Sequence, residues 1–328
     1  MKFLVIQTAF VGDVILATAV LEKLHRFYPD SKIDIVVRKG NETLFFRHPF
    51  INKVFVWNKK KNKLTNLFKL LADIRKEKYN HLINLQRFAS SGILTVFSKA
   101  KNTIGFNKNP LSFFFTERKF HDISRHGKIH EVQRNLSLVE SLTDLSFEKP
   151  RIYPGDADNE FTNKFKESAY ITMAPASVWY TKQLPKEKWI ELIQKVYTEN
   201  ENAVVYLLGG LDDKFLCDEI IEDIKYKGIT NLSGRLTLLQ SASLMKDAKM
   251  NYVNDSAPLH LASAMNAPVT AYFCSTVPAF GFTPLSDISY INETKENLYC
   301  RPCGLHGYRD CPETHFRCAK TIEMEVNL

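Results

Sequence analysis

The sequence has no run that approaches the ~18 to 20 unbroken apolar residues of a membrane-spanning helix. Its first residues imitate a signal peptide, because the apolar run at residues 3–6 precedes a small-residue triplet at residues 17–19. Gln7, Gly12 and Asp13 interrupt that pattern, since a translocated apolar core does not hold an unpaired carboxylate. We therefore expect a buried strand, a loop and a helix here, and only peripheral contact with a membrane.

The sequence also lacks the glycine motifs of two large nucleotide-binding classes. It contains neither G-x-G-x-x-G nor G-x-x-x-x-G-K-[ST], which disfavours a dinucleotide oxidoreductase and a P-loop NTPase. No repeat of solenoid period and no long low-complexity tract is present. A nucleotide-binding function, if present, must therefore use other loops.

Basic residues only modestly outnumber acidic residues. Lys and Arg number 44 against 36 Asp and Glu, and the net charge of +8 favours an anionic partner without naming it. The sequence has no RNP-type or recognition-helix signature, and its basic residues are not interleaved with aromatics in one stripe, which argues against nucleic acid. Anionic lipid and phosphorylated glycan stay compatible with this charge.

Short apolar runs alternate with amphipathic segments along the whole chain. This alternation predicts an α/β fold with mainly parallel, doubly wound sheets. Strands are expected at residues 2–7, 33–37, 54–57, 81–85, 103–106, 170–173, 203–208, 250–253 and 268–273. Helices are expected to follow the first strand from Val14 and to include residues 64–75, 186–199, 214–226, 236–245 and 259–265.

A polar stretch with Pro150, Pro154 and Gly155 interrupts this rhythm near the middle of the chain. With 328 residues, 45% of them hydrophobic, the chain can bury two cores. We therefore predict two Rossmann-like domains, residues 1–154 and 155–328, that face each other across a central cleft. Ligands of open α/β sheets bind beyond the carboxyl ends of the strands, so the loops at those ends are the candidate sites.

The first candidate site is the loop between the first strand and its helix. Asp13 is expected at or just inside the helix N-terminus, where a carboxylate stays ionised. An ionised carboxylate at a cleft edge can accept a proton from a sugar hydroxyl, as a general base does. The alternative is that Asp13 merely caps the helix. Gly12 is expected to allow a conformation or a close approach that a side chain would forbid.

The second candidate site spans residues 253–260, again a strand, a tight loop and a helix start. Ser256 is a natural N-cap, and Pro258 is tolerated in a first helical turn. Free N–H groups and the helix dipole at such a point can receive a diphosphate, although an ordinary capped helix has the same sequence pattern. His260 lies one turn further and either reaches the same ligand or is a satisfied core histidine.

Two further loops follow strands of the second half. Ser177 and Thr181 can hydrogen-bond phosphate oxygens, while the Lys182 ammonium can offset charge on a departing diphosphate. Asp212 and Asp213 follow the next strand, where a carboxylate holds ribose hydroxyls or merely caps a helix.

Taken together, these loops resemble the ADP-heptose:lipopolysaccharide heptosyltransferase family, also called glycosyltransferase family 9. The pairing of an early strand-x-G-D-helix with a late N-D-S-x-x-x-H is more specific than either half. The residues that carry the resemblance are Phe3, Leu4, Val5, Ile6, Gly12, Asp13, Val14, Asn254, Asp255, Ser256, Leu261, Ala262, Ser263 and Ala264. The resemblance implies a GT-B fold, an ADP-heptose donor held mainly by the C-terminal domain, and a lipopolysaccharide inner-core acceptor on the N-terminal domain. It also implies inversion at the anomeric carbon without a bound catalytic metal.

The resemblance assigns roles to particular residues. Asp13 is implied as the general base and Lys182 as the diphosphate partner. Asp212 or Asp213 is implied as the ribose or adenine-side contact. The donor-binding loop is implied to comprise Asp255, Ser256, Ala257, Pro258, Leu259 and His260. Members usually have Gly where Ala257 stands, which bears on how closely the donor approaches the backbone. Contacts to an anionic lipid-linked acceptor are expected from Lys59, Lys60, Lys61, Lys63, Arg87, Arg118 and Arg125.

Four of the six cysteines gather near the C-terminus, at Cys300, Cys303, Cys311 and Cys318. One C-x-x-C followed by two more cysteines is plausible ligand spacing for a structural Zn²⁺, although zinc ribbons usually have two such pairs. Disulfides are rare in a cytosolic enzyme, so the spacing favours metal over bridges. Cys217 and Cys274 lie in apolar surroundings and are expected to be inert core residues.

The sequence therefore predicts a cytoplasmic glycosyltransferase that contacts the inner face of the plasma membrane peripherally and needs no cofactor for catalysis. One alternative is the same scaffold acting with another nucleotide sugar and another glycan. A second, from a different class, is a non-catalytic module that binds a sugar nucleotide or nucleic acid through its basic surface.

Overall fold

The structure is a computed structural model that describes residues 1–124, 127, 129–224 and 226–328. The chain divides into two compact units. The first unit comprises Met1–Ile123 and Ile129–Tyr153, and the second comprises Pro154–Leu328 with the described residues of 124–128. The chain leaves the first unit between Tyr153 and Pro154, next to the boundary expected at residues 154 and 155.

The first unit is built on a six-stranded, entirely parallel sheet with the order β3-β2-β1-β4-β5-β6. Its strands are β1 (Lys2–Ile6), β2 (Lys32–Arg38), β3 (Ile51–Trp57), β4 (His81–Asn84), β5 (Asn102–Phe106) and β6 (Glu117–Lys119). Its helices are α1 (Val11–Phe27), α2 (Lys63–Glu77), α3 (Ala89–Phe97) and α4 (Glu131–Ser137), with 3₁₀ turns η1 (Glu42–Phe45) and η2 (Ser112–Phe114).

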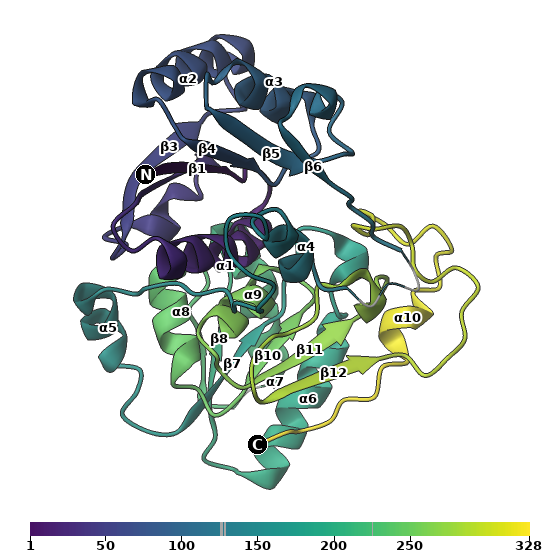
Figure 1. Ribbon diagram of the computed structural model, residues 1–328. Helices are drawn as coiled ribbons and strands as arrows, with labels where there is room; N and C mark the ends of the chain where they lie inside the picture. Colours follow the sequence, from purple (N-terminus) through teal and green to yellow (C-terminus); the bar gives the residue numbers. More distant parts are fainter. Residues whose placement is uncertain (125–126, 128, 225) are drawn as a thin grey trace. The chain divides into compact units, whose positions relative to one another are not determined.

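Helices cover both faces of this sheet, α2 and α3 on one and α1 and α4 on the other (Figure 1). Burial on both faces explains why β1 is a continuous apolar run, since Phe3, Leu4, Val5 and Ile6 are all fully buried. One apolar stripe of α2 packs against the sheet. Its residues repeat at helical spacing and are Leu67, Leu70, Leu71 and Ile74.

The second unit repeats the architecture with the order β12-β11-β10-β7-β8-β9, again entirely parallel. Its strands are β7 (Tyr170–Ala174), β8 (Val204–Leu207), β9 (Ile229–Asn231), β10 (Asn251–Asn254), β11 (Val269–Phe273) and β12 (Ser289–Glu293). Its helices are α5 (Asp156–Asn163), α6 (Lys186–Glu199), α7 (Lys214–Ile224), α8 (Leu238–Lys246), α9 (Ala257–Ala264) and α10 (Arg317–Lys320). Three 3₁₀ turns are η3 (Tyr180–Lys182), η4 (Leu211–Asp213) and η5 (Pro278–Phe280).

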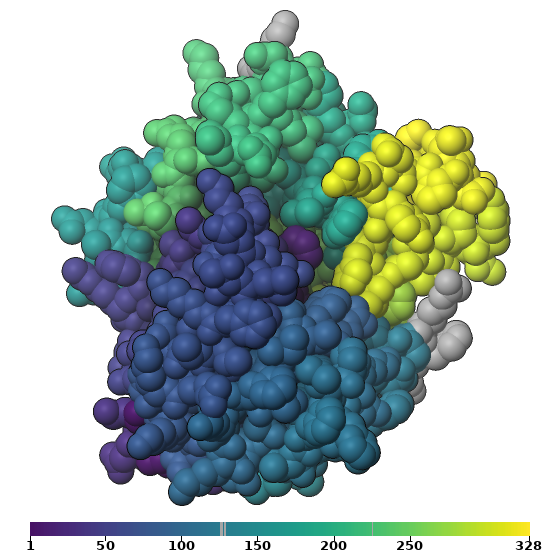
Figure 2. Space-filling model, turned by 90° about the horizontal axis from the view of Figure 1, so that it is seen from above, coloured from purple at the N-terminus to yellow at the C-terminus, as the bar shows by residue number. Residues whose placement is uncertain are grey.

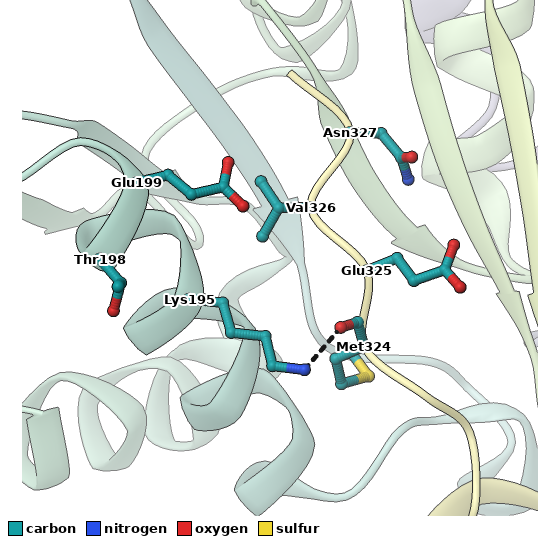
Figure 3. Close-up of a pocket in the computed structure, with 7 residues that line it drawn as sticks. All are labelled: Lys195, Thr198, Glu199, Met324, Glu325, Val326 and Asn327. Atoms are coloured by element: carbon teal, nitrogen blue, oxygen red, sulfur yellow. Dashed lines mark hydrogen bonds between the residues drawn. The ribbon is translucent and has the colours of Figure 1, made fainter.

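The C-terminal residues pack on α6 of the second unit. Phe316, Cys318, Ile322 and Met324 join the core that α6 forms with β7 and β8. Beyond that core, the Lys195 ammonium donates to the Met324 carbonyl oxygen at 2.8 Å, beside a pocket between the end of α6 and the last residues of the chain (Figure 3). This pocket lies at the amino edge of the sheet, because α6 returns the chain from the carboxyl edge, and it contains no predicted site residue.

The predicted α/β fold with two doubly wound parallel sheets is confirmed. α6 has the predicted bounds, whereas α1 begins at Val11, three residues earlier than expected. Strands β6, β9 and β12 were not predicted from the pattern, because they lie at the edges of their sheets and have few buried residues. No helix in the described part of the chain is long and apolar enough to cross a membrane.

Candidate functional site

Both sheets have the same topology when their strands are numbered within each unit, namely 3-2-1-4-5-6. In such a sheet the chain order reverses between the first and fourth strands, and ligands bind beyond their carboxyl ends. These strands are β1 and β4 in the first unit, and β7 and β10 in the second. Asp13 follows β1, Arg87 follows β4, Lys182 follows β7 and Asp255 follows β10. The predicted residues therefore fall at the switch point of each sheet.

In the second unit the structure brings Lys182 and Asp255 together. The Lys182 ammonium lies 2.8 Å from a carboxylate oxygen of Asp255, and the Thr276 hydroxyl donates to the same oxygen at 2.6 Å. Asp255 is 4% exposed, while the Lys182 side chain keeps 16% of its exposure. Asp255 thus holds an accessible ammonium at a fixed point beyond β7 and β10.

Asn254 links the loops that follow these two strands. Its fully buried side chain donates to the Pro175 carbonyl at 2.8 Å and accepts from the Leu184 amide at 3.0 Å. Within the same loop, the Ser177 amide donates to the Gln183 side chain at 3.1 Å. The chain from residue 175 to residue 184 is therefore fixed at both ends, and η3 with Lys182 lies between them. This role of Asn254 was not predicted from the sequence, although its place in the N-D-S motif was a signal.

Helix α9 begins beside Asp255, and Ser256 is its N-cap, as expected. The Ser256 side chain makes no capping hydrogen bond and instead donates weakly to the Asn254 carbonyl at 3.4 Å. The first-turn positions Ala257 and Pro258 are half-buried, whereas Leu259 and His260 are buried. A ligand could thus approach the positive end of α9 beside the half-buried Ser256 and Ala257. The burial of His260 favours the interpretation of this residue as a core histidine.

Two other predicted donor-site residues, Thr181 and Asp213, bond within the loops themselves. The Thr181 hydroxyl is buried and accepts from the Tyr308 amide at 2.8 Å and from the Ser275 hydroxyl at 3.0 Å. Asp213 accepts from the Gly210 amide at 2.7 Å, as a helix cap does, and burial raises the pKa of this carboxyl. Asp212 is exposed beside it.

In the first unit Asp13 is the third residue of α1 and is half-buried, with Gly12 directly before it. The helix is preceded by Phe10, which makes no side-chain cap, so the carboxylate of Asp13 lies in the first turn at the positive end of the dipole. Asp13 lies just inside the helix, as expected, and Phe10 rather than Asp13 occupies the N-cap position.

Lys59 differs from the other predicted acceptor lysines. Its ammonium donates to the backbone carbonyl and the hydroxyl of Thr8, at 2.7 and 3.0 Å, in the loop between β1 and α1. It also lies 4.6 Å from the ring centre of Trp57. Burial lowers the pKa of Lys59 to about 8, with smaller contributions from the positive charges of Arg38 and Lys63.

The remaining predicted acceptor residues are less constrained. Lys60, Lys61 and Lys63 are exposed beside Lys59. Arg87 is half-buried after β4, and Arg118 is exposed on the edge strand β6. Arg125 lies outside the described residues.

All six cysteines are free, and Cys217 and Cys274 are buried as expected. Within residues 1–124, 127, 129–224 and 226–328, no group of three or more His, Cys, Asp or Glu side chains is arranged to hold a metal ion. Cys300 Sγ lies 3.8 Å from His315 Nε2, and burial raises the pKa of the Cys318 thiol to about 12. A zinc site at Cys300, Cys303, Cys311 and Cys318 stays a prediction.

Known proteins share both the sequence and the fold of this chain. The chain is 26% identical over 278 residues to lipopolysaccharide heptosyltransferase 3 of Escherichia coli, covering 81% of this chain and 82% of that protein. It is 25% identical over 313 residues to lipopolysaccharide heptosyltransferase 1 of Campylobacter coli, covering 91% and 88%. The solved structure of E. coli ADP-heptose LPS heptosyltransferase II has a TM-score of 0.76 at 22% identity, covering 94% of this chain and 92% of that one.

That structural likeness shows that both units together have the GT-B fold of the heptosyltransferases. The sequence model of glycosyltransferase family 9 (heptosyltransferase) matches residues 67–306, most of the chain and most of the loops described above. The chain is therefore a glycosyltransferase, and it belongs to glycosyltransferase family 9, the heptosyltransferase family.

Proposed function

We propose that this enzyme transfers a heptose from ADP-heptose to a lipopolysaccharide inner-core acceptor, with inversion at the anomeric carbon. Membership of the heptosyltransferase family supports the sugar, and relatives named lipopolysaccharide heptosyltransferases support the acceptor. The name of the E. coli protein of similar fold supports the nucleotide. The observation that carries the proposal is the Lys182–Asp255 pair beside the start of α9, at the switch point of the second sheet.

The donor diphosphate binds at this pair. The Lys182 ammonium supplies a full positive charge, and the first N–H groups of α9 supply partial positive charge from a second direction. Asp255 keeps the ammonium in place before the donor arrives, so little rearrangement opposes binding. Both features stabilise the diphosphate more as it departs, because its negative charge increases in the transition state.

Asp13 acts as the general base. An acceptor hydroxyl gives its proton to the Asp13 carboxylate, and its oxygen attacks the anomeric carbon of the donor from the face opposite the diphosphate. The new glycosidic bond forms as the bond to the diphosphate breaks, and ADP leaves with the electron pair. A single displacement of this kind inverts the anomeric configuration.

The acceptor binds the first unit through its basic residues. Lys59 is the best-placed cation, because Thr8 fixes its ammonium in the loop that leads to Asp13. Lys60, Lys61, Lys63, Arg87 and Arg118 carry further positive charge on this unit, which suits phosphates or acid sugars of a lipid-linked glycan. Arg125, which was predicted with them from the sequence, lies outside the described residues. The enzyme is then cytoplasmic and contacts the inner face of the plasma membrane peripherally.

No step in this scheme needs a bound metal, because Lys182 and the α9 amides stabilise the leaving group. A structural zinc at the four C-terminal cysteines is a separate proposal that rests on their spacing alone. Metal analysis of protein purified without chelator tests it. About one zinc per chain supports the site, and a metal-free folded protein contradicts it.

A donor and acceptor panel tests the proposed function. We expect release of ADP only when ADP-heptose and a heptose-deficient lipopolysaccharide acceptor are both present. Release of another nucleoside diphosphate from its own sugar, with no turnover of ADP-heptose, would make this a transferase of different specificity. Salt-dependent oligonucleotide binding without any transfer would favour the non-catalytic alternative.

A further inference from the structure

The segment at residues 301–308 contacts the donor-site loops at several points, and of its residues the proposed function uses only Cys303, in the separate zinc proposal. It follows Cys300 and belongs to the C-terminal part of the chain, which gathers in one surface patch (yellow, Figure 2). Its partners are η3, which contains Lys182, and the loop after β11, residues 274–276, which contains Thr276. We call residues 301–308 the brace.

Arg301 holds the loop after β11. Its guanidinium donates to the carbonyl oxygens of Cys274 at 2.7 Å, Phe273 at 3.1 Å and Thr276 at 2.8 Å. The side chain is only 10% exposed, and Glu293 neutralises it at 2.6 Å. Three carbonyls bound by one planar cation fix the backbone of this loop, and with it the Thr276 hydroxyl that donates to Asp255.

Ser275 and Thr181 join this loop to η3, and Tyr308 closes the connection. The Ser275 amide donates to the Thr181 carbonyl at 3.1 Å, and the Thr181 amide donates to the Tyr308 carbonyl at 3.1 Å. The Cys303 amide donates to the Ser275 carbonyl at 2.9 Å. Ser275, Thr276 and Thr181 are at most 1% exposed. The hydrogen bonds therefore form one buried connection from the brace to the residue before Lys182.

Gly307 makes the closest approach to Lys182. A Cβ atom at this position would lie 2.8 Å from Thr181 Oγ1, 3.0 Å from Lys182 Cγ and 3.3 Å from Ser275 Oγ. Its φ of +75° also favours glycine. The brace backbone thus packs directly against the stem of the lysine, with no room for a methyl group.

We propose that two residues of the brace, Gly307 and Arg301, are positioning residues of the donor site, Gly307 for the Lys182 ammonium and Arg301 for the Thr276 hydroxyl on Asp255. The proposal depends on the proposed function only for the identity of the ligand, an ADP diphosphate. The contacts themselves involve only this chain.

Gly304 provides a matched control for Gly307. Its φ is +76°, so alanine is equally strained there, but a Cβ would meet only the flexible end of Tyr308, at 3.3 Å. Gly304→Ala should therefore lower the melting temperature through backbone strain alone, and Gly307→Ala should lower it further because the steric clash is added to the same strain. Only Gly307→Ala should speed amide hydrogen exchange in residues 177–184 of the ligand-free protein. It should also weaken binding of ADP by about tenfold or more, the loss expected when one charge-assisted hydrogen bond is weakened.

Equal exchange in residues 177–184 of the two variants, or equal loss of ADP affinity, would make the brace purely structural and overturn the proposal. If the parent protein binds no ADP, the exchange result still decides the brace, and it is the proposed function that fails. Should Gly307→Ala not fold, Arg301→Met replaces it, with Arg309→Met on an exposed side chain as its control. The same split between the variants is then expected.

Discussion

The two units share one strand order, yet the lysines at their carboxyl edges are held in opposite ways. Lys182 in the second unit is paired with the Asp255 carboxylate at 2.8 Å. Lys59 in the first unit donates to uncharged groups of Thr8, and among the residues that the structure describes no carboxylate shifts its pKa. One ammonium therefore has a counterion in its own unit, and the other has none within the part of the chain that the structure describes.

We interpret this difference as a difference between the two proposed anion sites. Lys182 is positioned in advance, so a diphosphate shares an ammonium whose place is already fixed. Lys59 is partly desolvated, and its partners among the described residues are the uncharged oxygens of Thr8 and the Trp57 ring. Burial therefore lowers its pKa, and an arriving anion would relieve that cost. We interpret the second unit as a preorganised donor site and the first as an edge that needs an anionic acceptor.

The largest effect is expected at Asp13, the proposed general base in the first unit. Asp13→Asn should reduce turnover by about 10²- to 10⁴-fold, the usual contribution of a general base. ADP affinity should be unchanged, because the proposed donor contacts belong to the second unit. Initial rates of ADP release and calorimetric titration with ADP measure the two quantities. Full turnover in this variant would remove Asp13 from the chemistry.

The next effect removes the preorganised cation. Lys182→Ala should weaken ADP binding by about 10- to 100-fold, as loss of a charge-assisted hydrogen bond does, and should lower turnover as well. Lys186→Ala is the control, because the Lys186 ammonium pairs with Asp223 at 3.0 Å on the surface. Calorimetry with ADP distinguishes the two variants, and equal affinities would place the diphosphate elsewhere.

A smaller effect tests how Asp255 is held. Thr276→Val deletes the 2.6 Å hydrogen bond to Asp255 and keeps the side-chain shape. ADP affinity should fall by a few-fold, about the 0.5–1.5 kcal/mol of one net hydrogen bond. Thr276→Ser should restore it, since serine keeps the hydroxyl. Failure of the serine variant to recover would point to packing rather than to the hydrogen bond.

The smallest effect is expected at Lys59, through the pH dependence of acceptor binding. Its pKa of about 8 lies below the ordinary value of 10.5, so the ammonium is charged below pH 8 and neutral above it. The KM for an anionic acceptor should therefore rise by about two- to fivefold between pH 7 and pH 9, the size of a partly exposed ionic contact. Lys59→Met should abolish this rise, and Lys61→Met, at an exposed lysine, should keep it. An unchanged pH profile in Lys59→Met would contradict the assignment.

The sequence predicted the sheets well because their central strands are buried on both faces. The run at residues 3–6 has no alternation and no polar interruption, and it predicted β1 once Gln7, Gly12 and Asp13 had argued against a signal peptide. The edge strand β12 has the sequence SYINE and is mostly exposed, so no apolar pattern marked it. That the two units face each other across a cleft stays a prediction.

The candidate site was predicted where a motif lies directly after a strand, as for Asp13, Lys182 and Asp255. Thr276 and Arg301 were missed because their roles depend on contacts between segments that are distant in the sequence. The Arg301 side chain, for example, donates to the Thr276 carbonyl, 25 positions earlier in the chain. Nothing in the local sequence of either residue shows those contacts. The sequence likewise predicted that the Thr181 hydroxyl could bind phosphate, whereas in the structure it is buried and bonded to Tyr308 and Ser275.

The most direct test of the account is the anomeric configuration of the product, determined by NMR after a single turnover with ADP-heptose and the lipopolysaccharide acceptor. A single displacement with Asp13 as base should give a glycosidic bond of configuration opposite to that of the donor, formed with release of ADP. A product that retains the donor configuration would contradict a direct displacement with Asp13 as base.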